Sequence, residues 1–156
     1  MAKQPPRTDQ ASRLIGASPH AIYQAMTTPA ALVQWLPPVG MSAEMVEFDL
    51  RPGGHYRMVL RYDDAAIAGK AGDGQDIVEA RFTELMPDAL VVQSVVFVSD
   101  DPDFAGTMTM RWMLTPFGAE TEVRIVAENV PPGISEADHL EGINASLENL
   151  AAFLEG

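Results

Sequence analysis

The chain contains no cysteine among its 156 residues, which excludes disulfide bonds, thiolate metal ligands and cysteine nucleophiles. A reducing cytoplasm is the simplest compartment for such a chain, so we predict a cytoplasmic protein. Basic side chains are also scarce, with ten Lys and Arg against 22 Asp and Glu, and the formal net charge is -12. This charge would repel the phosphates of nucleic acids and an anionic membrane surface, so we expect neither as a partner.

Long apolar runs are missing too, since none approaches the roughly 18 residues of a membrane span, and we expect no membrane insertion. The segment "MAKQPPRTDQ" carries prolines and charges where a secretory signal has an apolar stretch. The length is the usual size of one domain. We therefore predict a mobile lead-in over residues 1–9 and a single domain over residues 10–156, with both a monomer and a homodimer left open.

Two proline-led helices are predicted after a first strand at "ASRLIGA". Ser18 is a natural N-cap, and Pro19 follows it at the first helical position. Thr28 and Pro29 repeat this pair before "AALVQWL", and two further prolines stop that helix. The domain should therefore begin with one strand and two short helices.

The side-chain period changes to two between about residues 44 and 129, which is typical of strands with one buried face. In "HYRMVLRY", tyrosine, methionine and leucine alternate with charged residues, and "TMTMRWML" and "TEVRIVAE" alternate in the same way. Connections such as "MPDAL" and "TPFGAE" have the length of hairpins. The strands should therefore be antiparallel.

Glycines mark two connections of this sheet. Gly53 and Gly54 should take the positive φ angles of a tight turn, which residues with a Cβ resist. The segment "AIAGKAGDGQ" is predicted as a loop, because its glycine order and acidic surroundings do not fit a phosphate-binding fingerprint.

The last predicted helix is the longest. Ser135 and Asp138 approximate a capping box at its start. Apolar residues then recur at helical spacing on one face, at Leu140, Ile143, Leu147, Leu150 and Leu154. These elements predict an α+β fold. It should contain a curved antiparallel sheet of about six or seven strands, two short helices after the first strand, and the long C-terminal helix packed across the concave face.

Four stretches of the sequence, in this order, resemble a known family. They are "ASPHAIYQAMTTPAALVQWL", "DLRPGGHYR", "EARFTELMPDALVVQS" and "PPGISEADHLEGINASLENLAAFLE". They resemble the helix-grip fold of the SRPBCC superfamily, which includes the START and birch-pollen-allergen proteins. The chain is most similar to bacterial proteins related to activators of the heat-shock protein 90 ATPase. Two features depart from that pattern: the final helix lacks the tryptophan that many members carry, and the glycine that commonly precedes the "E" strand is displaced.

The resemblance implies a small soluble protein that binds an apolar or amphipathic small molecule between the sheet and the last helix. Two other functions stay open. One is an enzyme of the polyketide cyclase or hydrolase kind that uses the same cavity. The other is a chaperone-interacting module, related to stress, that uses the outer face of the sheet. Fold alone does not decide among them.

The sequence shows no recognisable catalytic or metal-binding motif. His20, His55 and His139 fall in three separate elements, without a second ligand at metal spacing. There is no GxSxG elbow and no catalytic triad pattern. We therefore expect no metal and no cofactor, name no catalytic residue, and favour a binding protein over an enzyme.

The expected cavity is apolar, with a few polar anchors. Methionines on the inward strand faces suit such a cavity, because thioethers adapt to irregular shapes. Trp35 is expected at its mouth, and Tyr62, Ser94 and His139 are the expected anchors. The predicted ligand-binding residues are Trp35, Tyr56, Met58, Leu60, Tyr62, Phe82, Ser94, Met108, Met110, Trp112, His139, Ile143 and Leu147.

Overall fold

The computed structural model describes residues 7–37, 40–64 and 74–155. Within them the chain forms seven strands and three α-helices. The elements are β1 (Asp9–Ile15), α1 (Pro19–Thr27), α2 (Pro29–Trp35), β2 (Met41–Phe48), β3 (His55–Tyr62), β4 (Gln75–Met86), β5 (Leu90–Phe97), a short 3-10 helix (Pro102–Phe104), β6 (Met108–Phe117), β7 (Glu120–Glu128) and α3 (Glu136–Glu155).

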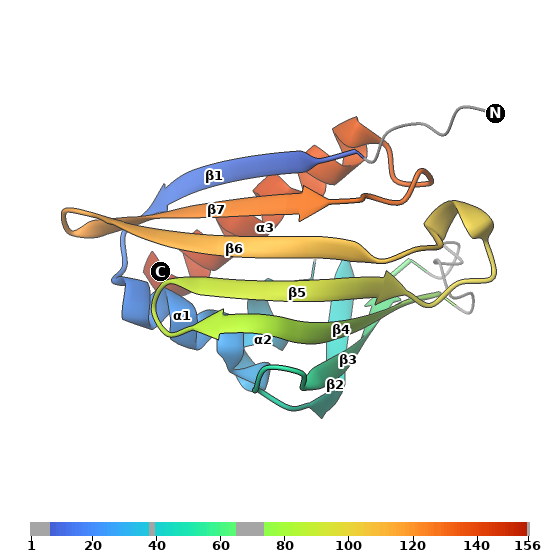
Figure 1. Cartoon of the computed structure of the whole chain (residues 1–156), viewed down its shortest axis with the longest axis horizontal. Coiled ribbons are helices and arrows are strands. Elements are labelled where there is room, and N and C mark those ends of the chain that lie inside the picture. Colours follow the sequence, from blue (N-terminus) through green and yellow to red (C-terminus); the bar gives the residue numbers. More distant parts are fainter. Residues whose placement is uncertain (1–6, 38–39, 65–73, 156) are drawn as a thin grey trace.

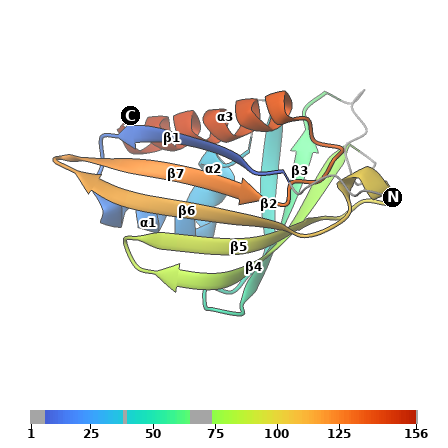
Figure 2. The same ribbon diagram turned by 45° about the horizontal axis from the view of Figure 1, so that its top comes forward.

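The strands form one antiparallel sheet in the order β1-β7-β6-β5-β4-β3-β2. The longest link joins the two edge strands, and α1 and α2 occupy it (Figure 1). The sheet curves around α3, which runs beside β1 and contacts α1 and α2 (Figure 2). The predicted α+β helix-grip fold is confirmed. None of the described helices is long and apolar enough to cross a membrane.

The predicted helix starts agree with the structure, with one exception. The Ser18 hydroxyl accepts a hydrogen bond from the amide of Ala21 at 3.1 Å, and Ser135 does the same for Asp138 at 3.1 Å. Thr28 stands at the N-cap of α2, but its side chain makes no capping bond. Proline in the first turn therefore marks the start of α2 without a hydroxyl cap.

A tryptophan satisfies the backbone at the junction of α1 and α2. The carbonyl of Ala25 would ordinarily accept a bond from the amide of residue 29, but residue 29 is a proline and has no N–H. The indole Nε1 of Trp35 donates to this carbonyl at 3.0 Å instead. The bond ties the second helix to the first.

The two turn glycines serve different purposes. Gly53 has a φ of 85°, as predicted, whereas Gly54 is absent from the described residues with positive φ, so that part of the prediction is wrong. Gly54 is required by space, because a Cβ there would lie 2.3 Å from the carbonyl oxygen of Asp49. The turn also exchanges backbone hydrogen bonds with Phe82 of β4.

The folded part begins slightly earlier than predicted. Strand β1 starts at Asp9, and the carbonyl of Arg7 accepts a bond from the amide of Val130. Residues 7–9 of the predicted lead-in therefore belong to the fold, while residues 1–6 lie outside the described residues. Most of the predicted "AIAGKAGDGQ" loop also lies outside them.

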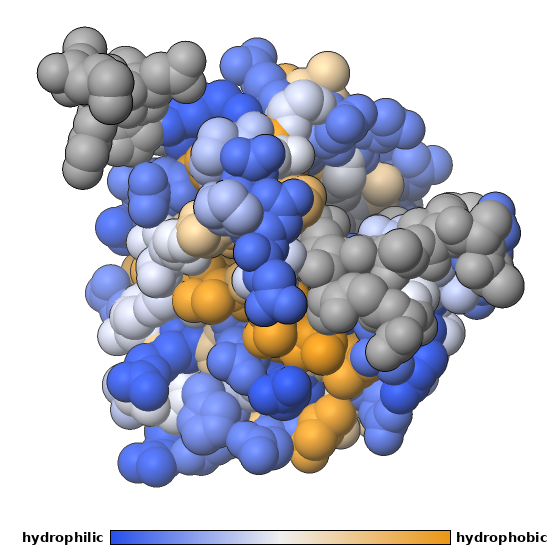
Figure 3. Space-filling view, turned by 90° about the vertical axis from the view of Figure 1, so that its right-hand side faces the viewer, coloured by the Kyte–Doolittle hydropathy of each residue, from blue (hydrophilic) through white to orange (hydrophobic). Residues whose placement is uncertain are grey.

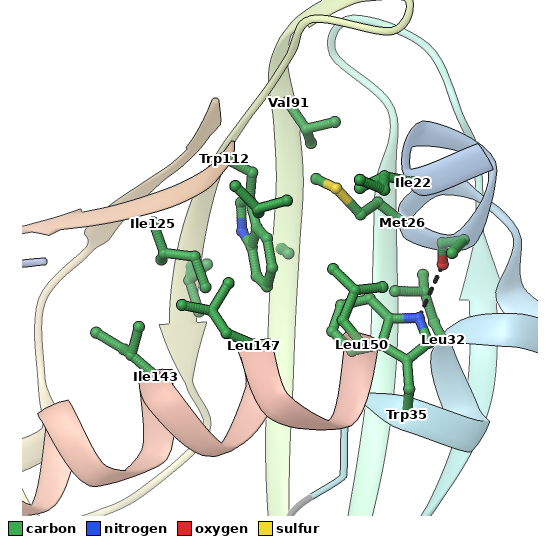
Figure 4. Packing of buried hydrophobic residues seen from close by; sticks show 14 of the residues in the cluster. Ile22, Met26, Leu32, Trp35, Val91, Trp112, Ile125, Ile143, Leu147 and Leu150 are labelled. Atoms are coloured by element: carbon green, nitrogen blue, oxygen red, sulfur yellow. Dashed lines mark hydrogen bonds between the residues drawn. The ribbon is translucent and has the colours of Figure 1, made fainter. Parts of the chain in front are cut away.

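The two faces of the sheet differ as their alternation predicts. Tyr56 and Met58 are buried on the inner face, and Ile125 is fully enclosed. The outer face carries ion pairs, such as Arg57 with Glu79 at 2.6 Å. In the core, Ile143, Leu147 and Leu150 of α3 point toward the sheet beside the two tryptophans, Trp35 and Trp112 (Figure 4). The inner face and the last helix therefore enclose a single apolar interior.

Candidate functional site

A cavity of about 290 Å3 lies between the inner face of the sheet and α3. Strands β3 to β7 provide its sheet wall, and Ile143 and its neighbours provide its helical wall. Leu36, just after α2, and Met41, at the start of β2, also line it. Small-molecule sites typically span about 300–1,000 Å3, so this cavity has the size of a small ligand.

The cavity opens where β3 ends and β4 begins. Leu60 and Tyr62 are only partly buried there, whereas Trp112, farther along β6, is buried. Hydrophobic surface appears among hydrophilic residues on this end of the molecule (Figure 3). The partial burial of Leu60 and Tyr62 leaves the apolar wall accessible at this end of the sheet.

A tyrosine and a carboxylate form a polar pair in the wall. The hydroxyl of Tyr62 donates to Oδ2 of Asp76 at 2.8 Å, and Asp76 is 4% exposed. Burial raises the pKa of Tyr62 to about 12, and the hydrogen bond to Asp76 and its charge act in the same direction. The phenol therefore remains a protonated donor at neutral pH.

A second polar pair lies deeper in the cavity. Tyr56 is hydrogen-bonded to the side chain of Gln93, and both residues are buried. Burial raises the pKa of Tyr56 to about 12, although the bond to Gln93 acts in the opposite direction. This pair can present neutral polar atoms to a bound molecule.

A third polar group joins α3 to β1. Nδ1 of His139 lies 2.7 Å from Oδ2 of Asp9, whose side chain is 1% exposed. Arg7 also contacts both carboxylate oxygens of Asp9, with Nε at 3.1 and 3.2 Å. His139 itself lines the cavity. The structure thus brings a histidine with a buried carboxylate partner to an otherwise apolar site.

The two tryptophans meet edge to face, with ring centroids 5.8 Å apart. Trp112 lines the cavity and is 6% exposed. Its buried Nε1 has no hydrogen-bond partner in the part of the chain that the structure describes. A buried donor of this kind is unusual, because nearly all such groups are satisfied by protein or ordered water.

The family can now be identified. Residues 16–155 match the family described as "Activator of Hsp90 ATPase homolog 1-like protein". The chain belongs to this family. The resemblance predicted from the sequence is therefore confirmed. No curated protein matches the chain.

Solved structures share the fold of this family member. A protein from Chromobacterium violaceum is 30% identical, with a TM-score of 0.85 over 96% of this chain and 97% of that one. A protein from Rhizobium loti is 26% identical, with a TM-score of 0.73 over 96% and 97% of the two chains. DynU16, from the dynemicin biosynthetic locus, is 18% identical, with a TM-score of 0.68 over 95% of this chain and 47% of its own.

Most of the residues predicted to bind a ligand line the cavity. They are Tyr56, Met58, Leu60, Tyr62, Met108, Met110, Trp112, His139 and Ile143. Their positions agree with the alternation of the strands and the stripe of the last helix. Their contact with a ligand stays a prediction.

The other predicted site residues lie outside the cavity lining. Trp35, Phe82 and Leu147 are core residues, exposed by 2% or less. Trp35 is not at the cavity mouth as expected, because its indole is held against α1. Ser94 faces the outer side of the sheet, because its neighbours Gln93 and Val95 face the cavity and strand side chains alternate. The expected anchoring role of Ser94 inside the cavity is therefore wrong.

The cavity also contains residues that the sequence analysis missed. They are Leu36, Met41, Asp76, Val78, Gln93, Val95, Phe97, Ile125, Gly142 and Ser146. Two signals could have found several of them. Asp76 shares the period-two phase of Phe82 on β4, and Gly142 and Ser146 share a helical face with His139.

A larger hollow of about 540 Å3 lies on the outer face of the sheet. Its charged groups include paired side chains, such as His55 with Glu47 at 2.8 Å and Arg57 with Glu79 at 2.6 Å. It has no apolar enclosure comparable with the inner cavity, so it is the weaker small-molecule site. Among the described residues, no three His, Cys, Asp or Glu side chains converge as metal ligands.

Proposed function

We propose that this protein binds an apolar or amphipathic small molecule in the cavity between the sheet and α3. The observation that carries the proposal is the open, mostly apolar space of about 290 Å3 beneath the last helix. Met58, Met108 and Met110 lie in its wall, and their flexible thioethers can adapt to a ligand's shape. The three polar pairs supply few but defined anchors.

The first test is native mass spectrometry of the purified protein, followed by titration with the neutral fluorescent probe N-phenyl-1-naphthylamine. Ser146→Phe should fill the cavity from α3 and weaken probe affinity by about tenfold or more, which corresponds to about 1.4 kcal/mol. Glu148→Phe is the matched control, because Glu148 is exposed on the same helix and outside the cavity lining. Equal probe affinity in both variants would contradict the cavity as the binding site.

An enzyme that moves a proton is the second candidate, and one observation favours it. His139 lines the cavity and is oriented by the buried carboxylate of Asp9, an arrangement that can hold a general base. One solved neighbour, DynU16, comes from a biosynthetic locus. Turnover of cyclisable polyketide-like substrates that is lost in His139→Phe would support the enzyme.

A chaperone-interacting module is the third candidate, and the name of the family motivates it. Such a contact would use the outer face of the sheet. Several charges on that face already pair with one another, including Arg57 with Glu79 and Arg111 with Glu128. Stimulation of the ATPase of purified heat-shock protein 90 would support this candidate over the binding protein.

A further inference from the structure

His139 combines burial, a fixed orientation and access to the cavity. Its side chain is 13% exposed and lines the cavity from α3. Nδ1 lies 2.7 Å from Oδ2 of Asp9, which fixes the plane of the ring against β1. No hydrogen bond to Nε2 is found within the described residues. One ring nitrogen is therefore engaged while the other remains available.

Arg7 is the charged partner of Asp9. Asp9 accepts hydrogen bonds from Arg7 at 3.1 to 3.2 Å, and an arginine remains charged at all ordinary pH values. The guanidinium of Arg7 also donates to the carbonyl of Ile134. A neutral His139 can therefore donate its Nδ1–H to Asp9, which leaves the lone pair of Nε2 as a hydrogen-bond acceptor.

Among the other polar groups of the cavity wall, Nε1 of Trp112 has no hydrogen-bond partner in the described chain, but it is a donor and cannot accept a bond from a ligand hydroxyl. Tyr62 donates to Asp76 across β3 and β4, and Tyr56 is bonded to Gln93. Among the described residues, the charged and titratable side chains that line the cavity with His139 are Tyr56, Tyr62 and Asp76. Asp9 contacts His139, and Arg7 contacts Asp9. Nε2 of His139 is therefore the acceptor best placed to meet a donor on a bound molecule.

The apolar space next to this acceptor sets the size of that molecule. Met110, Trp112 and Ile143 line the same cavity as His139. A dry cavity of about 150 Å3 is known to hold one benzene ring. The cavity of about 290 Å3 has roughly twice this volume, which suits two fused rings.

Building on the proposed binding function, we infer that the ligand is a phenol-class compound of about two fused rings. Its hydroxyl donates to Nε2 of His139, and its rings lie against the methionine and tryptophan wall. Asp9 acts as a positioning residue, because it holds the imidazole in the tautomer that accepts this hydrogen bond.

Two probes with the same fused rings, one with a hydroxyl donor and one with a methyl ether in its place, test the inference. We expect wild-type protein to bind 2-naphthol about threefold to tenfold more tightly than 2-methoxynaphthalene, measured by calorimetric titration. His139→Phe should abolish this ratio, and Asp9→Asn should reduce it. His55→Phe is the matched control, because His55 also pairs with a carboxylate but lies on the outer face, and the ratio should remain.

A second measurement uses the wild-type chain and does not depend on how the variants fold. In protein with 15N-labelled histidine, 2-naphthol should shift the Nε2 resonance of His139 and leave that of His55 unchanged. The ether should shift neither.

The outcomes separate the two proposals. If wild-type protein binds both probes equally, the phenol inference is overturned and the binding function stands. A ratio that persists in His139→Phe, or an unshifted Nε2 resonance in the presence of bound naphthol, overturns the inference as well. If neither probe binds at all, both proposals fail.

Discussion

At the scale of single residues, the two tryptophans are similarly buried but should contribute differently to the free energy of unfolding. Trp35 and Trp112 contact each other and are 2% and 6% exposed. The indole of Trp35 satisfies a carbonyl that a proline leaves without its usual donor, whereas the indole nitrogen of Trp112 has no partner in the described chain. A buried unsatisfied donor costs about 1–3 kcal/mol, so the same substitution should act differently at the two sites.

We therefore expect Trp35→Phe to lower the free energy of unfolding by about 1–2 kcal/mol more than Trp112→Phe. The first variant leaves the carbonyl of Ala25 without its hydrogen-bond donor, whereas the second removes a donor that has no partner in the described chain. Urea denaturation of both variants beside wild type measures the difference. Equal losses would mean that an ordered water or a retained ligand satisfies the indole of Trp112.

The tyrosines provide a second test at this scale. Burial raises the pKa of Tyr56 and of Tyr62 to about 12, and it also raises the pKa of Tyr23. A raised folded pKa means that the neutral phenol stabilises the fold, so this contribution is complete below pH 10 and is lost as pH rises toward 12. Folding stability should therefore fall across that alkaline range.

Absorbance titration of tyrosinate checks the shifts directly. At pH 10 the folded protein should show much less ionised tyrosine than the same chain in denaturant, where about half of the phenols are ionised. Tyr62→Phe should reduce the step near pH 12. Matching curves for folded and denatured protein would contradict the burial of these phenols.

At the scale of elements, α3 contains an unusual residue where it lines the cavity. Gly142 lies in the interior of this helix, and a Cβ placed there would meet nothing within 4 Å. Glycine in a helix interior is less favourable than alanine by about 0.8–1.0 kcal/mol. Gly142 therefore lowers the helix propensity of α3 at a position where the space next to the cavity lining is open.

Gly142→Ala should raise the free energy of unfolding by about 0.5–1 kcal/mol, because the helix gains propensity without a clash. Denaturant melts would measure this gain. Gly133→Ala is the contrasting control, since a Cβ there would lie 2.8 Å from the carbonyl oxygen of Asp103, and it should be destabilising. A loss of stability at residue 142 would indicate that the open space is used by the fold itself.

The elements also show how far sequence reasoning reaches. Strand alternation predicted the inward set Tyr56, Met58 and Leu60, because the period of two is a local property of the chain. The division of that inward face into core and cavity was not predictable. It depends on contacts between distant elements: the rings of Phe48 and Tyr56 pack against Phe82, which is fully buried, whereas Met110 is only partly buried. The hydrogen bond between His139 and Asp9 joins residues 130 positions apart in the sequence. No local sequence pattern predicts such a contact.

At the scale of the whole molecule, the net charge of -12 opposes the compact state. The outer-face ion pairs offset little of this repulsion, because exposed pairs such as Arg61 with Glu44 are each worth about 0–1 kcal/mol. Added salt should therefore weaken the net repulsion among the acidic side chains more than it weakens the attraction within the ion pairs.

The melting temperature should rise when NaCl is increased from about 10 mM to about 150 mM, because the screening length shortens from about 30 to about 8 Å. Glu148→Lys should weaken this salt dependence, since it removes two units of the excess negative charge at an exposed site. Differential scanning calorimetry at both salt concentrations measures the effect. A melting temperature that falls with salt would show that specific ion pairs outweigh the general repulsion.

The pairing of the first strand with the last has a consequence for synthesis on the ribosome. Asp9 lies opposite Ala127, and Ile15 opposite Thr121. The antiparallel partner of β1 in the sheet is β7, so the N-terminal segment leaves the ribosome long before that partner exists. Strands β2 to β6 can pair as successive neighbours while the chain grows, whereas β1 must wait for residues 120–128. The addition of β1 to the edge of the sheet, and with it the placement of Asp9 beside His139, is therefore a late event in the folding of the nascent chain.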